Sequence, residues 1–438
     1  MRYKWQNIFL VAASYFFYGY IHPAFCLLLF ISTISDYFLA QAIVNHSQHK
    51  KYFLVGSLCI NIGVLFYFKY FGFFAENVFA IFDSWGWEIN ETAWKVVLPV
   101  GISFYTFQTL SYTIDVYREK LQPTSNFIYF ALYVCFFPQL VAGPIERATR
   151  LLPQISQRRY FDTKKIRIAF ALIVWGFCKK LVIADNVGVY VNQIFLLEAP
   201  SLFMLLVGAL GFSIQILADF SAYTDIARGC AFLLGFELME NFKKPYLAIS
   251  PSDFWKRWHI SLSSWIRDYL YIPLGGSKGT TKIKLFWVIL ISMTLSGLWH
   301  GAAWTFILWG VYHGVLVFVY HLFGIKGSWK PKGLKWLVAW VLMYLFTLFG
   351  WLLFRTHSVV WLFESLMNPL FVNQEQFISA ITILLCMLMY SLPYAFYFLL
   401  LRFVKASSLW YPFFLGSALC LIFIFGNENG QDFIYFRF

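Results

Sequence analysis

Long apolar runs recur along this chain, and they limit the folds that are open to it. A transmembrane helix needs about 20 predominantly apolar residues, and the runs at 202–235, 334–354 and 376–401 reach that length. Only 13% of the residues are charged, about half the share usual in soluble domains. Because backbone polar groups must pair internally within lipid, these runs predict helices. The sequence therefore predicts an all-α polytopic membrane protein, with residues 1–438 forming a single membrane domain.

Loop charges predict how the chain is threaded through the bilayer. Basic loops mark the cytoplasmic side, so we assign the net charge of +13 to such loops rather than to nucleic-acid binding, and we assign the acidic loop of residues 76–91 to the outside. The segment 127–144, interrupted by Pro138 and flanked by basic loops, is expected to be re-entrant. The first run lacks a small-residue cleavage site and is expected to stay as a span rather than act as a signal peptide. The eleven predicted spans are 5–21, 24–44, 52–75, 96–117, 168–191, 202–235, 285–300, 303–321, 334–354, 376–401 and 408–425.

Several charged residues lie inside predicted spans, where ionisable groups are costly. Lys179 and Lys180 lie midway along 168–191, and they either extend to the interface or face a polar interior. Asp219 and Asp225 lie in the second half of 202–235, and Asp225 shares a helix face with Arg228, three residues on. Two interpretations of this second group stay open, an internal ion pair or one wall of a reaction chamber.

The block at 253–276 reads DFWKRWHISLSSWIRDYLYIPLGG, which is polar and rich in aromatic residues. This composition is typical of interfacial or re-entrant helices at the inner leaflet. Trp258 and Trp265 are seven residues apart and are expected to share one helix face. The basic residues Lys256, Arg257 and Arg267 are suited to hold phosphate groups of a cytoplasmic ligand, or alternatively to anchor the segment on anionic lipid.

His300, within SGLWHGAAW, is the strongest candidate for chemistry. It lies 15 residues from the start of the span 285–300, about 22 Å along a helix and beyond the membrane midplane. A desolvated histidine is kept neutral, and a neutral imidazole can act as general base. The alternative is a helix–helix hydrogen bond. Gly297 and Gly301 flank the histidine and would let another helix or a substrate approach the backbone closely.

The other histidines have weaker signals. His259 lies in the 253–276 block and is either interfacial or catalytic. His313 is expected to pack near the site, and His321 to lie at the interface. We expect no metal site, since no HExxH spacing occurs and the seven cysteines are scattered singly through apolar runs.

Several long motifs resemble the membrane-bound O-acyltransferase family. FWKRWHISLSSWIRDYLYIPLGG and SGLWHGAAWTFILWGVYHG are similar to its bacterial branch of alginate and peptidoglycan or exopolysaccharide O-acetyltransferases. LPVGISFYTFQTLSYTIDVYR, FFPQLVAGPIER, DFSAYTDIARGCAFLLGF and the terminal FIYFRF resemble the same group, so the resemblance covers nearly the whole chain. Teichoic-acid D-alanyl transferases are a weaker match.

This resemblance implies a fold, a reaction and a set of site residues. The fold would be a ring of about eleven spanning helices with re-entrant elements around a central tunnel. His300, in the WHG motif, and His259 would be the catalytic pair. The residues expected to bind the donor or line the tunnel are Trp255, Arg257, Trp258, Arg267, Asp268, Tyr269, Trp299, Asp219 and Asp225.

The resemblance also implies partners and a location. The enzyme would take an acetyl group from a cytoplasmic thioester, such as acetyl-CoA, for O-acetylation of a cell-envelope or extracellular polysaccharide. No cofactor would be bound, and an extracytoplasmic partner of the SGNH-hydrolase type would complete the transfer. The expected location is the bacterial cytoplasmic (inner) membrane. The alternatives are a D-alanyl transferase that uses a carrier protein, or a non-enzymatic transporter, for which the expected inverted repeats are not visible in the sequence.

Overall fold

The chain is helical throughout the part that the computed structural model describes. That part comprises residues 3–20, 22–86, 97–141, 143–160, 162–276, 279, 281–325, 329–400, 410–427, 430 and 432–434, and no strand occurs within it. The all-α prediction is therefore confirmed. The chain divides into two compact units, a first unit of residues 1–162 with 234–239 and a second unit of residues 163–233 with 240–438. The prediction of a single membrane domain stays a prediction.

The first unit is built from helices that share a buried polar network. Asp36 accepts hydrogen bonds from Ser57, Asn61 and Thr113, which join α2, α3 and α5. Satisfied networks of this kind rigidify an apolar interior. The helices are α1 (Tyr3–Gly19), α2 (Phe25–Asn45), α3 (Lys50–Leu65), the π-helical turn η2 (Phe66–Tyr70), α4 (Phe71–Ser84), α5 (Ile102–Tyr117), α6 (Phe127–Cys135), α7 (Phe137–Leu140) and α8 (Ala148–Ser156).

The segment predicted to be re-entrant is a broken helix. α6 ends at Cys135, Phe136 leaves the helical conformation, and Pro138 lies in the first turn of the short α7. Proline is tolerated at that position because its missing N–H would have no partner there. The break rules out one straight helix over 127–144, although its depth in the membrane stays a prediction.

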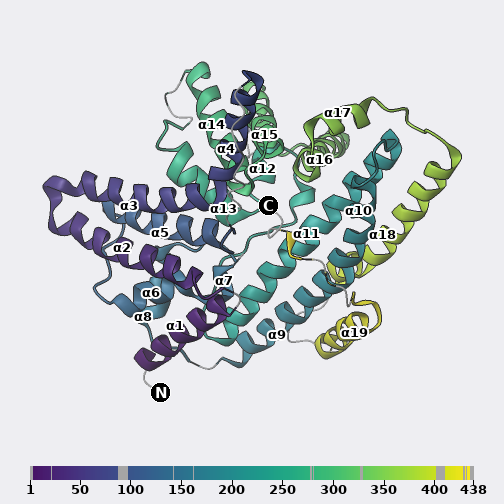
Figure 1. Cartoon of the computed structure of the whole chain (residues 1–438). Coiled ribbons are helices and arrows are strands. Elements are labelled where there is room, and N and C mark those ends of the chain that lie inside the picture. Colours follow the sequence, from purple (N-terminus) through teal and green to yellow (C-terminus); the bar gives the residue numbers. More distant parts are fainter. Residues whose placement is uncertain are drawn as a thin grey trace. The chain divides into compact units, whose positions relative to one another are not determined.

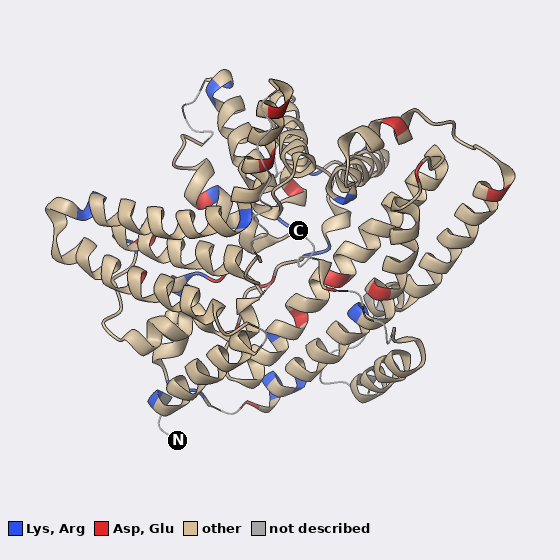
Figure 2. Cartoon of the chain, viewed as in Figure 1, with Lys and Arg blue, Asp and Glu red and all other residues tan. Residues whose placement is uncertain are grey.

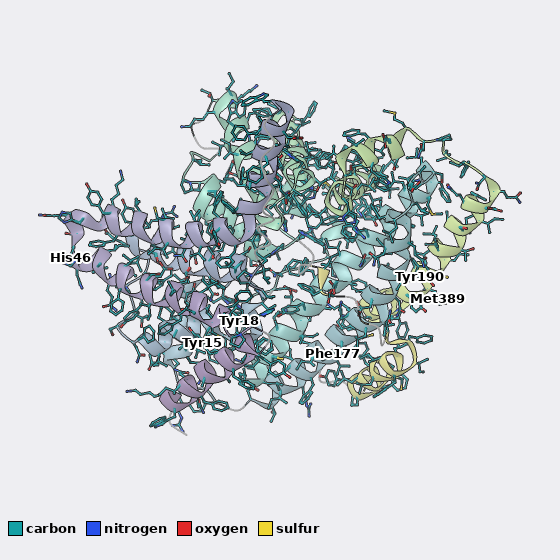
Figure 3. The ribbon with its side chains drawn as sticks, viewed as in Figure 1. Tyr15, Tyr18, His46, Phe177, Tyr190 and Met389 are labelled. Carbon is teal, nitrogen blue, oxygen red and sulfur yellow. The ribbon has the colours of Figure 1, made fainter. Side chains whose placement is uncertain are left out.

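The second unit contains the longest helices (Figure 1). α11 packs against α9 and α10, and α14 packs against α15. Figure 3 shows Tyr190 and Met389 on the contacting helices α10 and α18. The helices are α9 (Thr163–Phe177), the π-helical η3 (Cys178–Ala184), α10 (Asp185–Phe195), α11 (Leu202–Leu233), the 3-10 turn η4 (Pro245–Leu247), α12 (Pro251–Phe254), α13 (Ile260–Ile266), the π-helical η5 (Arg267–Tyr271), α14 (Lys282–His300), α15 (Trp304–Leu322), α16 (Leu334–Arg355), α17 (Val359–Met367), α18 (Gln374–Leu400) and α19 (Trp410–Phe425).

Seven helices within the described ranges are long and apolar enough to cross a membrane, which supports a multi-pass membrane protein. They cover residues 25–45, 47–84, 202–233, 282–300, 304–322, 334–355 and 374–397. The four other predicted spans also form helices, at 3–19, 102–117, 163–195 and 410–425, but these are shorter or more charged. The exact number of crossings therefore stays a prediction. Residues 87–96 and 401–409, which contain parts of predicted loops and spans, lie outside the described residues.

The two lysines inside the α9–η3–α10 helix face a polar interior. Lys179 lies 2.8 Å from Asp225, while Lys180 lies 2.7 Å from Asp185 and 3.1 Å from Asp219. Figure 2 shows basic and acidic segments along these helices and α11. Charges within apolar surroundings are usually paired in this way. Of the two alternatives for the lysines, the contacts therefore select the polar interior.

Candidate active site

His300 is the last residue of α14 and lies in an aromatic enclosure. Its ring centre is 5.2 Å from those of Trp309 and Phe354, and its exposed fraction is 4%. The helix ends at Gly301, whose backbone is extended. A Cβ atom there would lie 2.2 Å from the ring of Phe306, so a glycine at this position lets that ring pack directly against the backbone that follows His300.

α14 and α15 approach each other closely just before His300. A Cβ atom on Gly297 would lie 2.2 Å from the carbonyl oxygen of Phe306, and one on Gly310 would lie 2.5 Å from that of Met293. Both glycines therefore let the two backbones touch. The close helix approach predicted at Gly297 is confirmed.

His259 separates α12 from α13 and is fully buried. Its φ of 40° is in the left-handed region, which is uncommon for a residue other than glycine and is often found at functional sites. Its ring centre lies 6.4 Å from that of His300. The Trp299 ring is 5.8 Å from His259 and 5.1 Å from His300. Burial lowers the pKa of His259 to about 3, so its imidazole is neutral at neutral pH.

The backbone conformation of His259 also corrects one expectation. Trp258 and Trp265 do not share a helix face, because the left-handed residue between them ends the helical path before α13 begins. Trp258 instead packs in the core, with its ring centre 5.8 Å from Phe254 and 4.7 Å from Trp351.

A cavity of about 630 Å³ lies beside residues 289–296 of α14 and the end of α15. Ser296, which lines it, lies one helical turn before His300 on α14, while Lys256 and Arg267 line it as well. The lysines at the start of α14 are the basis for expecting that end of the helix in the cytoplasm, and this sidedness stays a prediction. The lining residues are Ser252, Trp255, Lys256, Ile260, Ser263, Ser264, Ile266, Arg267, Tyr271, Ile289, Ser292, Met293, Ser296, Val317, His321 and Ile325.

A second cavity, of about 380 Å³, lies where α14 and α16 end and α15 begins. It is lined by Gly301, which follows His300, and by Phe354, whose ring contacts that of His300. The two cavities are therefore lined by close neighbours of His300 in the sequence, Ser296 before it and Gly301 after it. The lining residues are Gln215, Gly301, Ala302, Ala303, Thr305, Phe306, Phe354, Arg355, Thr356, His357 and Ile434.

Some predicted donor-binding residues lie away from the larger cavity. Arg257 pairs with Asp253 at 2.8 Å, and Asp268 pairs with Arg267 at 2.8 Å. Tyr269 is buried. Of the predicted donor or tunnel residues, Trp255 and Arg267 line the cavity, and the roles of the others stay predictions.

Asp219 and Asp225 have partners within the helices of the second unit. Asp225 contacts Arg228 at 3.8 Å in addition to Lys179. Asp219 accepts a hydrogen bond of 2.7 Å from the backbone N–H of Ile434. Neither carboxylate lines the two cavities. Asp225 and Arg228 therefore form the expected ion pair, and their role in the wall of a reaction chamber stays a prediction.

The sequence reasoning overlooked the serines of the larger cavity. Ser292, Ser296 and His300 recur at intervals of four on α14, which places them on one helix face. That spacing could have identified them. His321, predicted to be interfacial, also lines this cavity, whereas His313 packs against Trp309 with ring centres 4.7 Å apart.

Comparisons with known proteins give the chain its family. Residues 101–324 match the membrane-bound O-acyltransferase family. The chain is 38% identical over 359 residues to "Probable alginate O-acetylase AlgI" of Azotobacter vinelandii, covering 81% of this chain and 71% of that protein. It is 31% identical over 382 residues to "Peptidoglycan O-acetyltransferase" of Helicobacter pylori, with 81% and 71% covered. It is also 31% identical over 280 residues to "Teichoic acid D-alanyltransferase" of Bacillus subtilis, with 58% and 68% covered. The resemblance carried by the motifs is thereby confirmed, and the chain belongs to the membrane-bound O-acyltransferase family as a membrane O-acyltransferase.

Proposed function

We propose that this enzyme transfers an acetyl group from a cytoplasmic thioester, such as acetyl-CoA, for O-acetylation of a polysaccharide outside the cytoplasm. The observation that carries the proposal is that neighbours of His300 line two different cavities, with Ser296 one turn before it on the larger cavity and Gly301 directly after it on the smaller one. Donor and acceptor would reach the imidazole from opposite sides. The names of two relatives, an alginate O-acetylase and a peptidoglycan O-acetyltransferase, support this substrate class.

The chemistry asked of His300 is general base and then general acid catalysis. Its imidazole accepts the proton of the acceptor hydroxyl while the hydroxyl oxygen attacks the carbonyl carbon of the thioester. The C–S bond then breaks, and the thiolate takes the proton back from the imidazolium, which leaves an ester and a free thiol. A positioned base of this kind contributes about 10²–10⁴-fold in rate. Neutral His259, 6.4 Å away between ring centres, assists by positioning the donor.

The larger cavity offers groups that suit a phosphate-bearing thioester. Lys256 and Arg267 lie on its wall and would contact the phosphates, because charge-assisted hydrogen bonds to phosphate are strong. Ser263, Ser292 and Ser296 also line this cavity, and Ser296 lies one helical turn before His300. They would hydrogen-bond the amide groups of a pantetheine arm that extends to the imidazole.

The proposal includes a location and partners. Lysines at the starts of α14 and α16 favour a cytoplasmic position for those ends, in a bacterial inner membrane. The acceptor side would then face outward, where an SGNH-hydrolase-like partner takes part in the transfer of the acetyl group to the polymer. We propose that the enzyme needs no bound cofactor besides the thioester substrate.

D-alanyl transfer is a second candidate reaction. It is supported by the 31% identity to a teichoic acid D-alanyltransferase over 58% of this chain. The same histidine chemistry would then act on a thioester held by a carrier protein. A transporter is disfavoured by membership of an acyltransferase family.

The test uses the full-length protein in lipid nanodiscs with a polysaccharide acceptor and radiolabelled acetyl-CoA or, in parallel, with the same acceptor and a D-alanyl carrier protein. We expect thiol release from acetyl-CoA and a loss of at least about 100-fold in His300→Ala. His313→Ala is the matched control, since its side chain is equally buried, with an exposed fraction of 3% against 4%. The control should unfold as easily as His300→Ala but keep most of the activity.

Two outcomes would count against this assignment. If a folded His300→Ala protein turned over acetyl-CoA at the wild-type rate, His300 would not be the general base. If the enzyme turned over the D-alanyl carrier protein but not acetyl-CoA, its reaction would be D-alanyl transfer and not acetyl transfer.

A further inference from the structure

We infer that the smaller cavity beside His300 binds an anionic group, of the carboxylate or phosphate type, carried by a hydroxylated acceptor. Arg355 would bind the anion, and Gln215 would bind a hydroxyl group. This inference rests on the proposed function, since it names the class of molecule that meets His300 from the side opposite the thioester.

Arg355 is held in a defined orientation at the end of α16. Its Nη2 donates a hydrogen bond of 2.8 Å to Asn192, and its Nη1 lies 3.1 Å from Nε2 of His357. The guanidinium also lies over the Phe195 ring, 5.0 Å from its centre. These contacts come from α10, α16 and the turn after α16, and they orient a cationic group that lines the cavity. A fixed guanidinium fork matches the paired oxygens of a carboxylate or a phosphate.

His357 lies beside this guanidinium and also lines the cavity. Burial and the neighbouring Arg355 charge lower the pKa of His357. At neutral pH its imidazole is therefore uncharged and able to hydrogen-bond. At neutral pH the positive charge that favours an anion is therefore that of the Arg355 guanidinium.

Gln215 provides a second, independent sign of a polar ligand. Its exposed fraction is 6%, and its side-chain oxygen has no hydrogen-bond partner among the residues that the structure describes. A buried polar atom without a partner costs free energy. Gln215 lines the cavity from α11, while its amide nitrogen lies against Gly188 of α10. A ligand hydroxyl that donates to the oxygen would satisfy it.

The start of α15 adds to the same wall. Ala303 precedes the helix and provides no side-chain cap, so the first backbone N–H groups lack the usual acceptor. Ala303 and Thr305 both line the cavity. The N-terminus of a 19-residue helix attracts negative charge, in agreement with the charge of Arg355.

The size of the cavity and its neighbours restrict the ligand further. A volume of about 380 Å³ is at the small end of known ligand sites and suits a single sugar-sized unit. Gly301 and Phe354, which flank His300, line the cavity together with Arg355. An anion held by Arg355 would therefore leave a hydroxyl of the same unit free to turn toward the imidazole.

The experiment measures binding to the full-length protein in nanodiscs, without any thioester. Sodium glucuronate probes a carboxylate on a hydroxylated ring, glucose is its neutral counterpart, and inorganic phosphate probes the other anion. We expect glucuronate or phosphate to bind about tenfold more tightly than glucose. Arg355→Gln should abolish that preference, while Gln215→Leu should weaken both sugars by a similar factor. Arg167→Gln, which removes an exposed arginine of the same unit, should change nothing.

Comparing the two anions shows whether the ligand's negative charge is a carboxylate or a phosphate. A preference for glucuronate assigns a carboxylate, and a preference for phosphate assigns a phosphate, provided that Arg355→Gln removes it. Equal binding of all three probes to the wild-type protein, or a preference that survives in folded Arg355→Gln, would overturn the inference. If Arg355→Gln fails to fold, Arg355→Lys keeps the charge without the fork and should show a reduced preference. Because no acyl donor is present, failure here leaves the acetyl-transfer test on His300 unaffected.

Discussion

Replacing Gly297 by alanine tests whether the contact between α14 and α15 sets the position of His300. The added Cβ atom would lie 2.2 Å from the carbonyl oxygen of Phe306 and 3.1 Å from the backbone of Gly310. Ordinary van der Waals contact begins near 3.4 Å, so the two helices must separate by about 1.2 Å to accept the methyl group. Backbone atoms on both sides of the contact prevent relief by a side-chain rotation.

The expected size of the effect follows from that displacement. Overpacking a close contact costs about 1–3 kcal/mol, so the unfolding midpoint should fall. His300 lies one turn after Gly297, and a misplacement of about 1 Å near a reacting group can cost about 100-fold in rate. We therefore expect Gly297→Ala to lose activity far more than it loses folded protein. Thermal unfolding in detergent and thiol release from acetyl-CoA measure the two effects.

Gly416→Ala is the matched control for this substitution. Gly416 lies in α19, where a Cβ atom would meet nothing within 4 Å. Alanine is favoured over glycine in a helix by about 1 kcal/mol, so this variant should be as stable as the wild type or more so, with unchanged activity. Wild-type stability and turnover in Gly297→Ala would refute the claim that the helices are in backbone contact.

Two further predictions concern buried charges. Burial raises the pKa of Glu146 to about 7, above its ordinary value of 4.5, so the folded state binds this proton more tightly than the unfolded state. The stability associated with this proton is present below about pH 4.5 and is lost as the pH rises through about 7. In thermal unfolding scans from pH 5 to 8, Glu146→Gln should therefore lose less stability with rising pH than the wild type. An equal loss in both proteins would show that Glu146 is not the group responsible. Lys179→Met should destabilise the protein by about 3 kcal/mol, because it removes the buried cation 2.8 Å from Asp225 and leaves that carboxylate with the more distant Arg228 at 3.8 Å. The double variant with Asp225→Leu should recover most of that loss in denaturant unfolding, and no recovery would show that the pair is not the cause.

Local sequence patterns were informative wherever the physical cause is local. Apolar runs predicted the helices because every backbone group in lipid must pair within its own segment. Pro138 predicted the interruption between α6 and α7, since proline removes a donor and restricts the backbone. The same reasoning failed at Trp258 and Trp265, where the heptad spacing assumed a continuous helix that His259 interrupts. A left-handed histidine has no sequence signature.

The long motifs identified the family and singled out His300, because residues close together in the sequence are enough to define a local motif. The surroundings of that histidine were settled by contacts between distant parts of the chain. Arg355 is oriented by Asn192, 163 residues earlier, and Asp219 binds the backbone of Ile434, 215 residues later. Helix packing depends on side-chain shapes that meet only after the chain has folded. The two cavities that neighbours of His300 line, and the arginine that lines one of them, are therefore properties of the tertiary structure alone.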